Sequence, residues 1–277
     1  MIARIPGAAM RGLLVALLVA TPFLLLPGAA SEAPEIIVLL ALVAALLTFL
    51  EYNATYPSFV EFRDAPPLNR IRFVALFAMV LALTLIARHG YEPSTLTALV
   101  VAFGGLVGQA MDFPYSPVRL LGLMMQADAD PAVTETLRSA AGLAYATALC
   151  AVAAFGFLVR MMGWPIGMGA FNVWINLPLF DPTTGGDVVA RLQRDGRGNI
   201  ILGVLLPFLI PAIVKAGVGL FGPVGFSSPQ TLIWTISAWA FLPASMVMRG
   251  IAMLRVADLI EEKRRRAYAN AEAVQTA

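Results

Sequence analysis

Between Arg160 and Asp181 the chain reads RMMGWPIGMGAFNVWINLPLFD, with no charged residue inside the run. Its length suits a membrane span, because a helix needs about 20 predominantly apolar residues to cross a bilayer core. The prolines, glycines and asparagines within it favour a re-entrant or surface segment instead. The two interpretations place all later residues on opposite sides of a membrane, so this run controls the topology.

The remainder of the chain is equally apolar. Hydrophobic residues make up 59% of the 277 residues and charged residues only 13%, whereas soluble proteins carry about 25% charged residues. The composition predicts an all-α, polytopic transmembrane helix bundle. We expect residues 1–248 to form one transmembrane helical domain, and residues 249–277 to continue the last helix as a cytoplasmic basic tail.

Eight apolar runs are long enough to be spans. They cover residues 12–30, 35–50, 73–88, 95–111, 139–159, 162–180, 199–221 and 229–248. The first run also resembles a secretory signal, because Arg4 and Arg11 precede it and the small residues 28–30 could form a cleavage site. Cleavage there would leave seven spans.

The distribution of positive charge favours a crossing by residues 162–180. If that run crosses, roughly 16 of the 19 Lys and Arg lie on one side and 2 on the other, with Lys215 inside a span. If it does not cross, the basic tail lies opposite the basic N-terminus. The sequence therefore predicts eight spans with both termini cytoplasmic. Abundant alanine and an excess of arginine over lysine suggest a bacterial cytoplasmic (inner) membrane.

Little in the sequence points to catalysis. Cys150 is the only cysteine and His89 the only histidine, so cysteine metal sites and ligation by paired histidines are not expected. No span carries two acidic residues that could act as acid and base. We predict no catalytic, cofactor-binding or metal-binding residue. Nucleic acid is not an expected partner, because the basic residues form no common face.

Two adjacent runs carry a candidate solute path. Lys215 is the only charged residue well inside a span, and an intramembrane ionisable group is a functional hypothesis by default. Pro207 and Pro211 precede it at a spacing of four and can kink the helix. Asn172 and Asn176 would share one face of the preceding helix. The alternative is that Lys215 reaches the outer interface and the asparagines bond neighbouring helices.

The loop between the second and third runs, residues 51–72, is a candidate partner contact. Its aromatic and arginine side chains are of the kinds enriched in interface hot spots. Equally, the aromatics could lie in the interfacial belt of the membrane. The candidate contact residues are Tyr56, Phe59, Phe62, Arg63 and Arg70.

Small residues and the tail indicate further contacts. Gly104 with Gly108, and Gly163 with Gly167, have the spacing that lets helix backbones approach closely. The basic run at residues 263–266 is expected to bind anionic lipid of the bilayer. The glycine pairs could pack within the chain, in a homo-oligomer or against a membrane-protein partner.

These features support two functional hypotheses. The first is a structural, accessory or assembly component of a membrane complex, which explains why the spans carry few polar groups. The second is a small-solute permease or channel with its path between the sixth and seventh helices. The first is favoured for the same reason, since transporters normally need more intramembrane polar groups.

Overall fold

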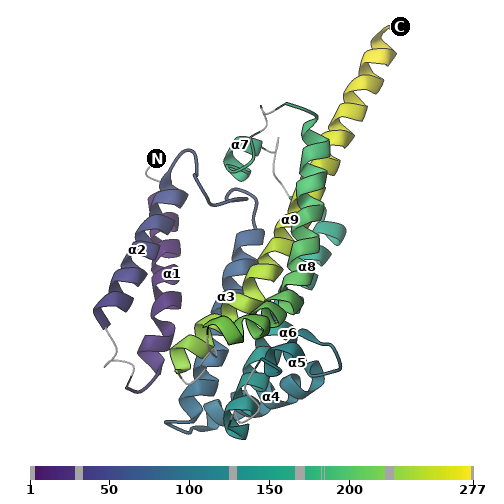
Figure 1. Cartoon of the computed structure of the whole chain (residues 1–277). Coiled ribbons are helices and arrows are strands. Elements are labelled where there is room, and N and C mark those ends of the chain that lie inside the picture. Colours follow the sequence, from purple (N-terminus) through teal and green to yellow (C-terminus); the bar gives the residue numbers. More distant parts are fainter. Residues whose placement is uncertain are drawn as a thin grey trace.

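The computed structural model describes residues 4–28, 34–124, 130–165, 172–181, 183, 185–221 and 228–275. Over these residues every element is a helix (Figure 1). Six helices are long and apolar enough to cross a membrane: α1 (Ile5–Leu25), α2 (Pro34–Asn53), α3 (Leu68–His89), α6 (Pro131–Met161), α8 (Val188–Phe221) and α9 (Pro229–Gln275). The shorter ones are α4 (Thr95–Met111), α5 (Pro117–Gly122) and α7 (Val173–Asn176). The predicted all-α fold is thereby confirmed over the described residues, and its long apolar helices are consistent with a multi-pass membrane protein.

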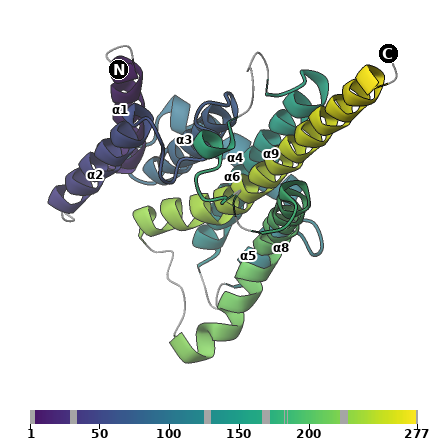
Figure 2. The same cartoon turned by 90° about the horizontal axis from the view of Figure 1, so that it is seen from above.

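The long helices define two ends of the bundle. We call the end that carries loop 54–67 the cap end, and the opposite end, where α3 stops at His89, the α4 end. Helix α1 begins and α9 ends at the cap end (Figure 1). The α1–α2 pair lies to one side of the other helices (Figure 2). Its outward leucines are exposed in the isolated chain, as expected of side chains that face lipid.

The core forms where α3, α6 and α9 meet. Helix α6 turns an alanine-rich face inward, and these short side chains let the neighbouring helices approach closely. Large side chains of α3 and α9 fill the space opposite. The buried set includes Ala140, Ala144, Ala148, Leu83, Met79, Ile233 and Ile236.

Helices α8 and α9 pack as an antiparallel pair around internal prolines. Pro211 has no N–H to bond the carbonyl of Pro207, four residues earlier. That carbonyl accepts a hydrogen bond from the indole N–H of Trp239 at 3.1 Å. The proline therefore leaves no unsatisfied carbonyl in the bundle at this point, and α9 supplies the missing donor.

Helix α4 has the predicted bounds, yet both of its ends lie at the α4 end. Near its start, Thr97 Oγ1 lies 2.9 Å from His89 Nδ1. Just after its end, Asp112 lies 3.9 Å from Arg138, near the start of α6. Between these contacts Gly104 packs beside Ile86 and Ser139. The fourth predicted span is therefore correct as a helix, and it is shorter than the six helices of membrane length.

The described residues of the run 162–180 do not form the continuous helix that a span requires. Its described residues contain only the four-residue helix α7. Gly163 adopts a φ of +63°, the left-handed conformation that favours glycine, just after α6 ends. Trp164 Nε1 donates to Pro66 O at 3.1 Å, and Asn176 Oδ1 accepts from Asp64 N at 3.1 Å. Both ends of the run contact the same loop, so the prediction of a crossing helix here is wrong for the described residues.

Helix α9 runs unbroken past the bundle. Its segment around Ala252 and Val256 is buried against the cap end, while residues 263–272 are exposed. Arg264 bonds Asp187 at 2.7 Å, and this bond holds the pKa of the Asp187 carboxyl below its ordinary value. The expected continuation of the last helix is present over the described residues.

Candidate functional site

Loop 54–67 folds around the carboxylate of Glu51, the last acidic residue of α2. Oε1 of Glu51 accepts the N–H of Ser58 at 3.0 Å, and Oε2 accepts the same N–H at 2.9 Å. Oε2 also accepts the N–H groups of Phe59 and Val60, both at 3.1 Å. Three successive backbone donors thus surround one buried carboxylate, an anion-binding arrangement in which the anion belongs to the chain itself.

Arg63 binds the end of α2 and the first residues of the same loop. Its guanidinium donates to the carbonyls of Glu51 at 2.9 Å, Ala54 at 2.7 Å and Thr55 at 3.2 Å. It also pairs with Asp64 at 3.2 Å. The rigid, planar guanidinium of an arginine can donate to several acceptors at once. The Glu51 carboxylate thus accepts hydrogen bonds from backbone N–H groups of the loop, and the Arg63 guanidinium donates to its backbone carbonyls.

A second polar cluster attaches the loop to α9. Arg249 Nη2 donates to Glu61 Oε1 at 2.7 Å, and Glu61 is only 7% exposed. Beside this pair Arg72 Nη2 donates to Ser245 O at 2.8 Å. Arg255 Nε donates to Trp164 O at 3.1 Å. These bonds join α3, α9 and the run 162–180 to loop 54–67.

Sequence reasoning missed this cluster because it treated residues 51–72 as a surface loop. One signal was present: two acidic residues, Glu51 and Glu61, stand in the region where arginines gather. Buried charges are normally paired or bonded. The bonded residues lie up to 188 positions apart in the sequence, so a search for charged pairs among neighbouring residues could not have found them.

The five candidate contact residues separate into two groups. Tyr56 and Phe59 are 69% and 51% exposed, and Arg70 is also exposed. Phe62 is fully buried, with its ring centroid 5.8 Å from that of Trp164. Arg63 is 8% exposed and fully engaged in the loop. Only the first three side chains are accessible from outside.

The structure does not bring the candidate solute-path residues together. Asn176 is buried at the cap end, and exposed Asn172 lies at the start of the same short helix. Lys215 lies near the α4 end, where its Nζ donates to Leu123 O. Pro207 and Pro211 lie between these ends in α8, and the indole of Trp239 takes the freed carbonyl.

The candidate packing glycines have different surroundings. A Cβ on Gly108 would lie 2.9 Å from Arg138 O, and Gly104 faces Ile86, so both lie in the contact of α4 with α3 and α6. Gly163 has no atom within 4 Å of such a Cβ. Its role is the left-handed turn after α6. Gly167 lies outside the described residues.

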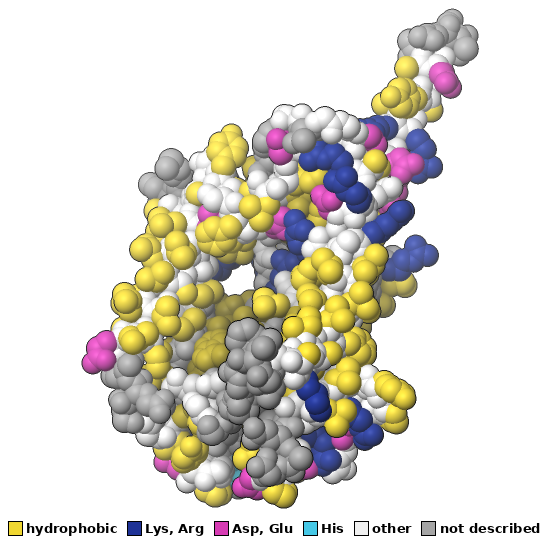
Figure 3. All heavy atoms as spheres, viewed as in Figure 1, with side chains coloured by type: hydrophobic (Ala, Val, Ile, Leu, Met, Phe, Trp, Pro, Cys, Tyr) yellow, Lys and Arg dark blue, Asp and Glu magenta, His cyan; other side chains and the backbone are white. Residues whose placement is uncertain are grey.

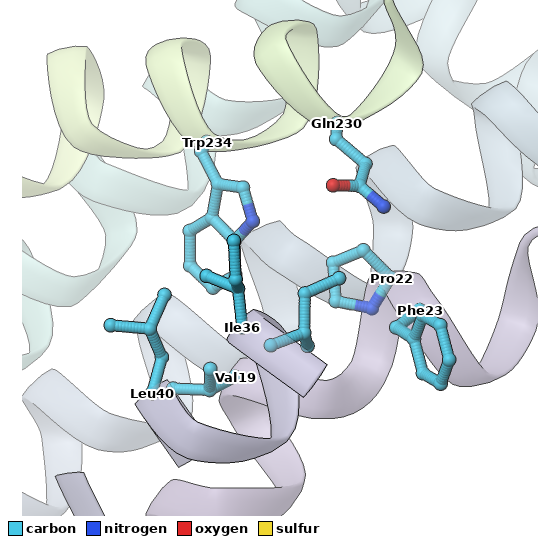
Figure 4. A pocket seen from close by; sticks show the side chains of 8 residues that line it. Val19, Pro22, Phe23, Ile36, Leu40, Gln230 and Trp234 are labelled. Atoms are coloured by element: carbon cyan, nitrogen blue, oxygen red, sulfur yellow. The ribbon is translucent and has the colours of Figure 1, made fainter. Parts of the chain in front are cut away.

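Two cavities lie along one face of α1. The upper cavity, near the cap end, has a volume of about 790 Å³ and lies between α1, α2, loop 54–67 and α3. The lower cavity, about 570 Å³, lies between α1, α2 and the start of α9. In Figure 4, Trp234 and Gln230 of α9 point toward Val19, Pro22 and Leu40. Figure 3 shows the molecule hollowed between the α1–α2 pair and the remaining helices.

Among the described residues no three His, Cys, Asp or Glu side chains gather in a way that could hold a metal ion. No family model, no curated protein and no solved structure matches this chain. What the fold shows is an all-helical, apolar bundle with six helices of membrane length, which is consistent with a multi-pass membrane protein.

Proposed function

We propose that the chain crosses the membrane six times, with both termini cytoplasmic. The support is that α4 and the run 162–180 each return to the end where they begin. Six long apolar helices then remain. Of the 19 Lys and Arg, the four at the α4 end are Arg88, Arg119, Arg138 and Lys215, which leaves 15 at the cap end. Under the positive-inside rule this excess supports a cytoplasmic cap end.

We infer that the protein is a structural or assembly component of a bacterial inner-membrane complex. The observation that carries this inference is the rigid display of Tyr56 and Phe59. Buried Glu51 and Arg63 hold the loop through backbone bonds, while the two aromatic side chains point outward. Aromatic groups held in place before binding lose little entropy on contact, which is the property of an interface hot spot.

Exposed Arg70 and the projecting end of α9 extend this cytoplasmic contact surface. The partner in this proposal is another membrane protein, and the chain itself performs no reaction. The permease alternative gains no support from the fold, since Asn176 and Lys215 lie toward opposite ends of the bundle.

A pull-down with matched variants tests the docking role. Native purification in mild detergent, followed by quantitative mass spectrometry, would compare the unchanged protein with the double variant Tyr56→Ala and Phe59→Ala. We expect a stoichiometric membrane-protein partner whose recovery falls at least tenfold in the variant, because two hot-spot aromatics are removed.

The control double variant is Tyr91→Ala with Phe113→Ala. Both side chains are exposed aromatics, at 58% and 54%, but they lie near the α4 end. Partner recovery from this control should match that of the unchanged protein. Equal recovery from both double variants, or a partner-free monomer from the unchanged protein, would contradict the proposal.

A further inference from the structure

All charged side chains that line the upper cavity are positive. Its polar side includes Arg11, Arg63 and Arg70, together with Tyr52 and Asn69, and no acidic residue lines it. The Asp64 carboxylate that pairs with Arg63 is not among the lining residues. A ligand with a negative group is therefore complementary to this end of the cavity.

The two outer arginines retain donors for such a ligand. Arg11 lies over the ring of Tyr52, with its guanidinium carbon 4.6 Å from the ring centroid, and one of its nitrogens donates to Gly7 O at 2.8 Å. Its other nitrogens are uncommitted in the described part of the chain. Arg70 is exposed and has no ion-pair or hydrogen-bond partner among the described residues. Arginine forks suit phosphate oxygens in particular.

The other side of the cavity is apolar and open to the lipid. Met10 and Val74 line it and are 56% and 63% exposed in the isolated chain. Leu14, Val15 and Phe73 complete this side. Because α1 and α3 are membrane-length helices, the bilayer would cover these side chains. A ligand that enters this cavity from the bilayer and fits both of its sides therefore has a polar head group and an apolar tail.

The same face of α1 continues to the lower cavity. Arg11, Val15, Val19 and Phe23 follow one another at a spacing of four and so lie on one helix face. From Arg11 to Phe23 the rise is about 18 Å at 1.5 Å per residue. Half of a hydrocarbon core of about 30 Å is a similar depth. An acyl chain of the cytoplasmic leaflet would fit along this face.

We propose that the groove between the α1–α2 pair and α3 binds one anionic phospholipid of the surrounding bilayer. The phosphate lies between Arg11 and Arg70 at the cap end, and an acyl chain lies along Met10, Leu14 and Val74. Basic pockets between helices on the cytoplasmic side are known to take anionic head groups. This site is separate from the exposed basic run of α9 and does not include Tyr56 or Phe59, but it shares Arg70 with the edge of the proposed contact surface.

Native mass spectrometry of the delipidated, full-length protein tests the proposal. The probes are phosphatidylglycerol and phosphatidylethanolamine with identical acyl chains. We expect one phosphatidylglycerol to bind the unchanged protein about tenfold more tightly than phosphatidylethanolamine. The double variant Arg11→Gln with Arg70→Gln should lose that preference. The control Arg265→Gln with Arg266→Gln removes the same charge from the exposed tail and should keep it.

A second variant covers the case in which the loss of Arg11 disturbs folding. Val74→Trp fills the apolar side from an exposed position and leaves all arginines in place, so it should weaken binding of both lipids. The single variant Arg70→Gln, which alters only an exposed side chain, should weaken phosphatidylglycerol more than phosphatidylethanolamine, because both lipids carry a phosphate but only phosphatidylglycerol has a net negative charge. Equal affinity of the unchanged protein for the two lipids would overturn the proposal. The proposal would also be overturned if the preference for phosphatidylglycerol disappeared in the tail control and remained in Arg70→Gln.

Discussion

Glu51 and Arg63 are buried charges whose partners are mostly backbone groups. A carboxylate only accepts hydrogen bonds and a guanidinium only donates them. Glu51 therefore binds backbone N–H groups, and Arg63 binds backbone carbonyls. An unmade hydrogen bond at a buried group costs far more than an average bond contributes. Two side chains therefore specify the conformation of loop 54–67, which has no regular secondary structure of its own.

Replacing Glu51 with Gln should loosen the loop. The amide replaces one carboxylate oxygen with an NH2 group, and Ser58 N–H contacts both oxygens, so in either orientation an amide donor faces at least this backbone donor. The full negative charge that binds the N–H groups of Phe59 and Val60 is also lost. We expect a loss of about 2 kcal/mol in stability, typical of a charged hydrogen-bond network. The measurement is unfolding in detergent, together with the rate of proteolytic cleavage within residues 54–67. Glu35→Gln, at the exposed start of the same helix, is the control, and equal effects of the two changes would contradict this account.

Residue type alone did not show which loop aromatics are interior. Phe59 and Phe62 are alike in sequence, but Phe62 donates its N–H to the carbonyl of Asn176 at 2.6 Å and packs its ring on Trp164. Those partners lie more than 100 residues away. Both residues could be predicted as apolar groups near a membrane edge, whereas their separation into core and surface depended on a distant segment.

At the scale of elements, the α8–α9 pair depends on glycine. A Cβ on Gly203 would lie 2.5 Å from Pro243 O and 2.7 Å from a methyl of Val247. Similarly, a Cβ on Gly250 would lie 2.5 Å from Gly196 O. Small residues at these crossings let the two helix backbones approach as membrane helices commonly do.

Gly203→Ala should destabilise the bundle, whereas Gly198→Ala should not. Alanine gains about 1 kcal/mol in helix propensity over glycine at either position. At Gly203 the overlap with backbone costs about 1–3 kcal/mol, which equals or exceeds that gain. Around Gly198 no atom lies within 4 Å of the added methyl. Thermal unfolding in detergent should place the Gly203 variant below the Gly198 variant, and the reverse order would show that the helices do not pack as described.

At the scale of the whole molecule, the proposed topology differs from the sequence prediction at two runs. The sequence predicts that residues 95–111 and 162–180 each cross, whereas the proposal has both return, on the basis of the contacts near their ends. Removing two crossings from eight leaves the termini on the same side. The conclusion about the termini therefore survives in the proposed topology, although the number of spans and the sides of Arg119, Arg138 and Arg160 change.

Single-cysteine labelling distinguishes the two topologies. In a Cys150→Ala background, cysteines at Tyr56, Met161, Glu92 and Phe113 would be probed with a membrane-impermeant maleimide in sealed inverted vesicles. Six crossings predict labelling at residues 56 and 161 and protection at 92 and 113. Eight spans predict labelling at 56 and 113 instead. Detergent-opened vesicles provide the control, since all four positions should then react.

The order of residues was sufficient to derive the long helices, their lipid-facing composition and the bounds of α4. Those properties follow from local hydrophobicity and from helix length against bilayer thickness, which each segment carries within itself. Whether an apolar segment crosses or returns depends on where its ends find hydrogen-bond and ion partners. In this chain the contacts of Thr97 with His89, Asp112 with Arg138, and Trp164 with Pro66 are the ones on which the proposed topology rests. Such partners come together only when the helices pack, so hydropathy and charge counting could not reveal them.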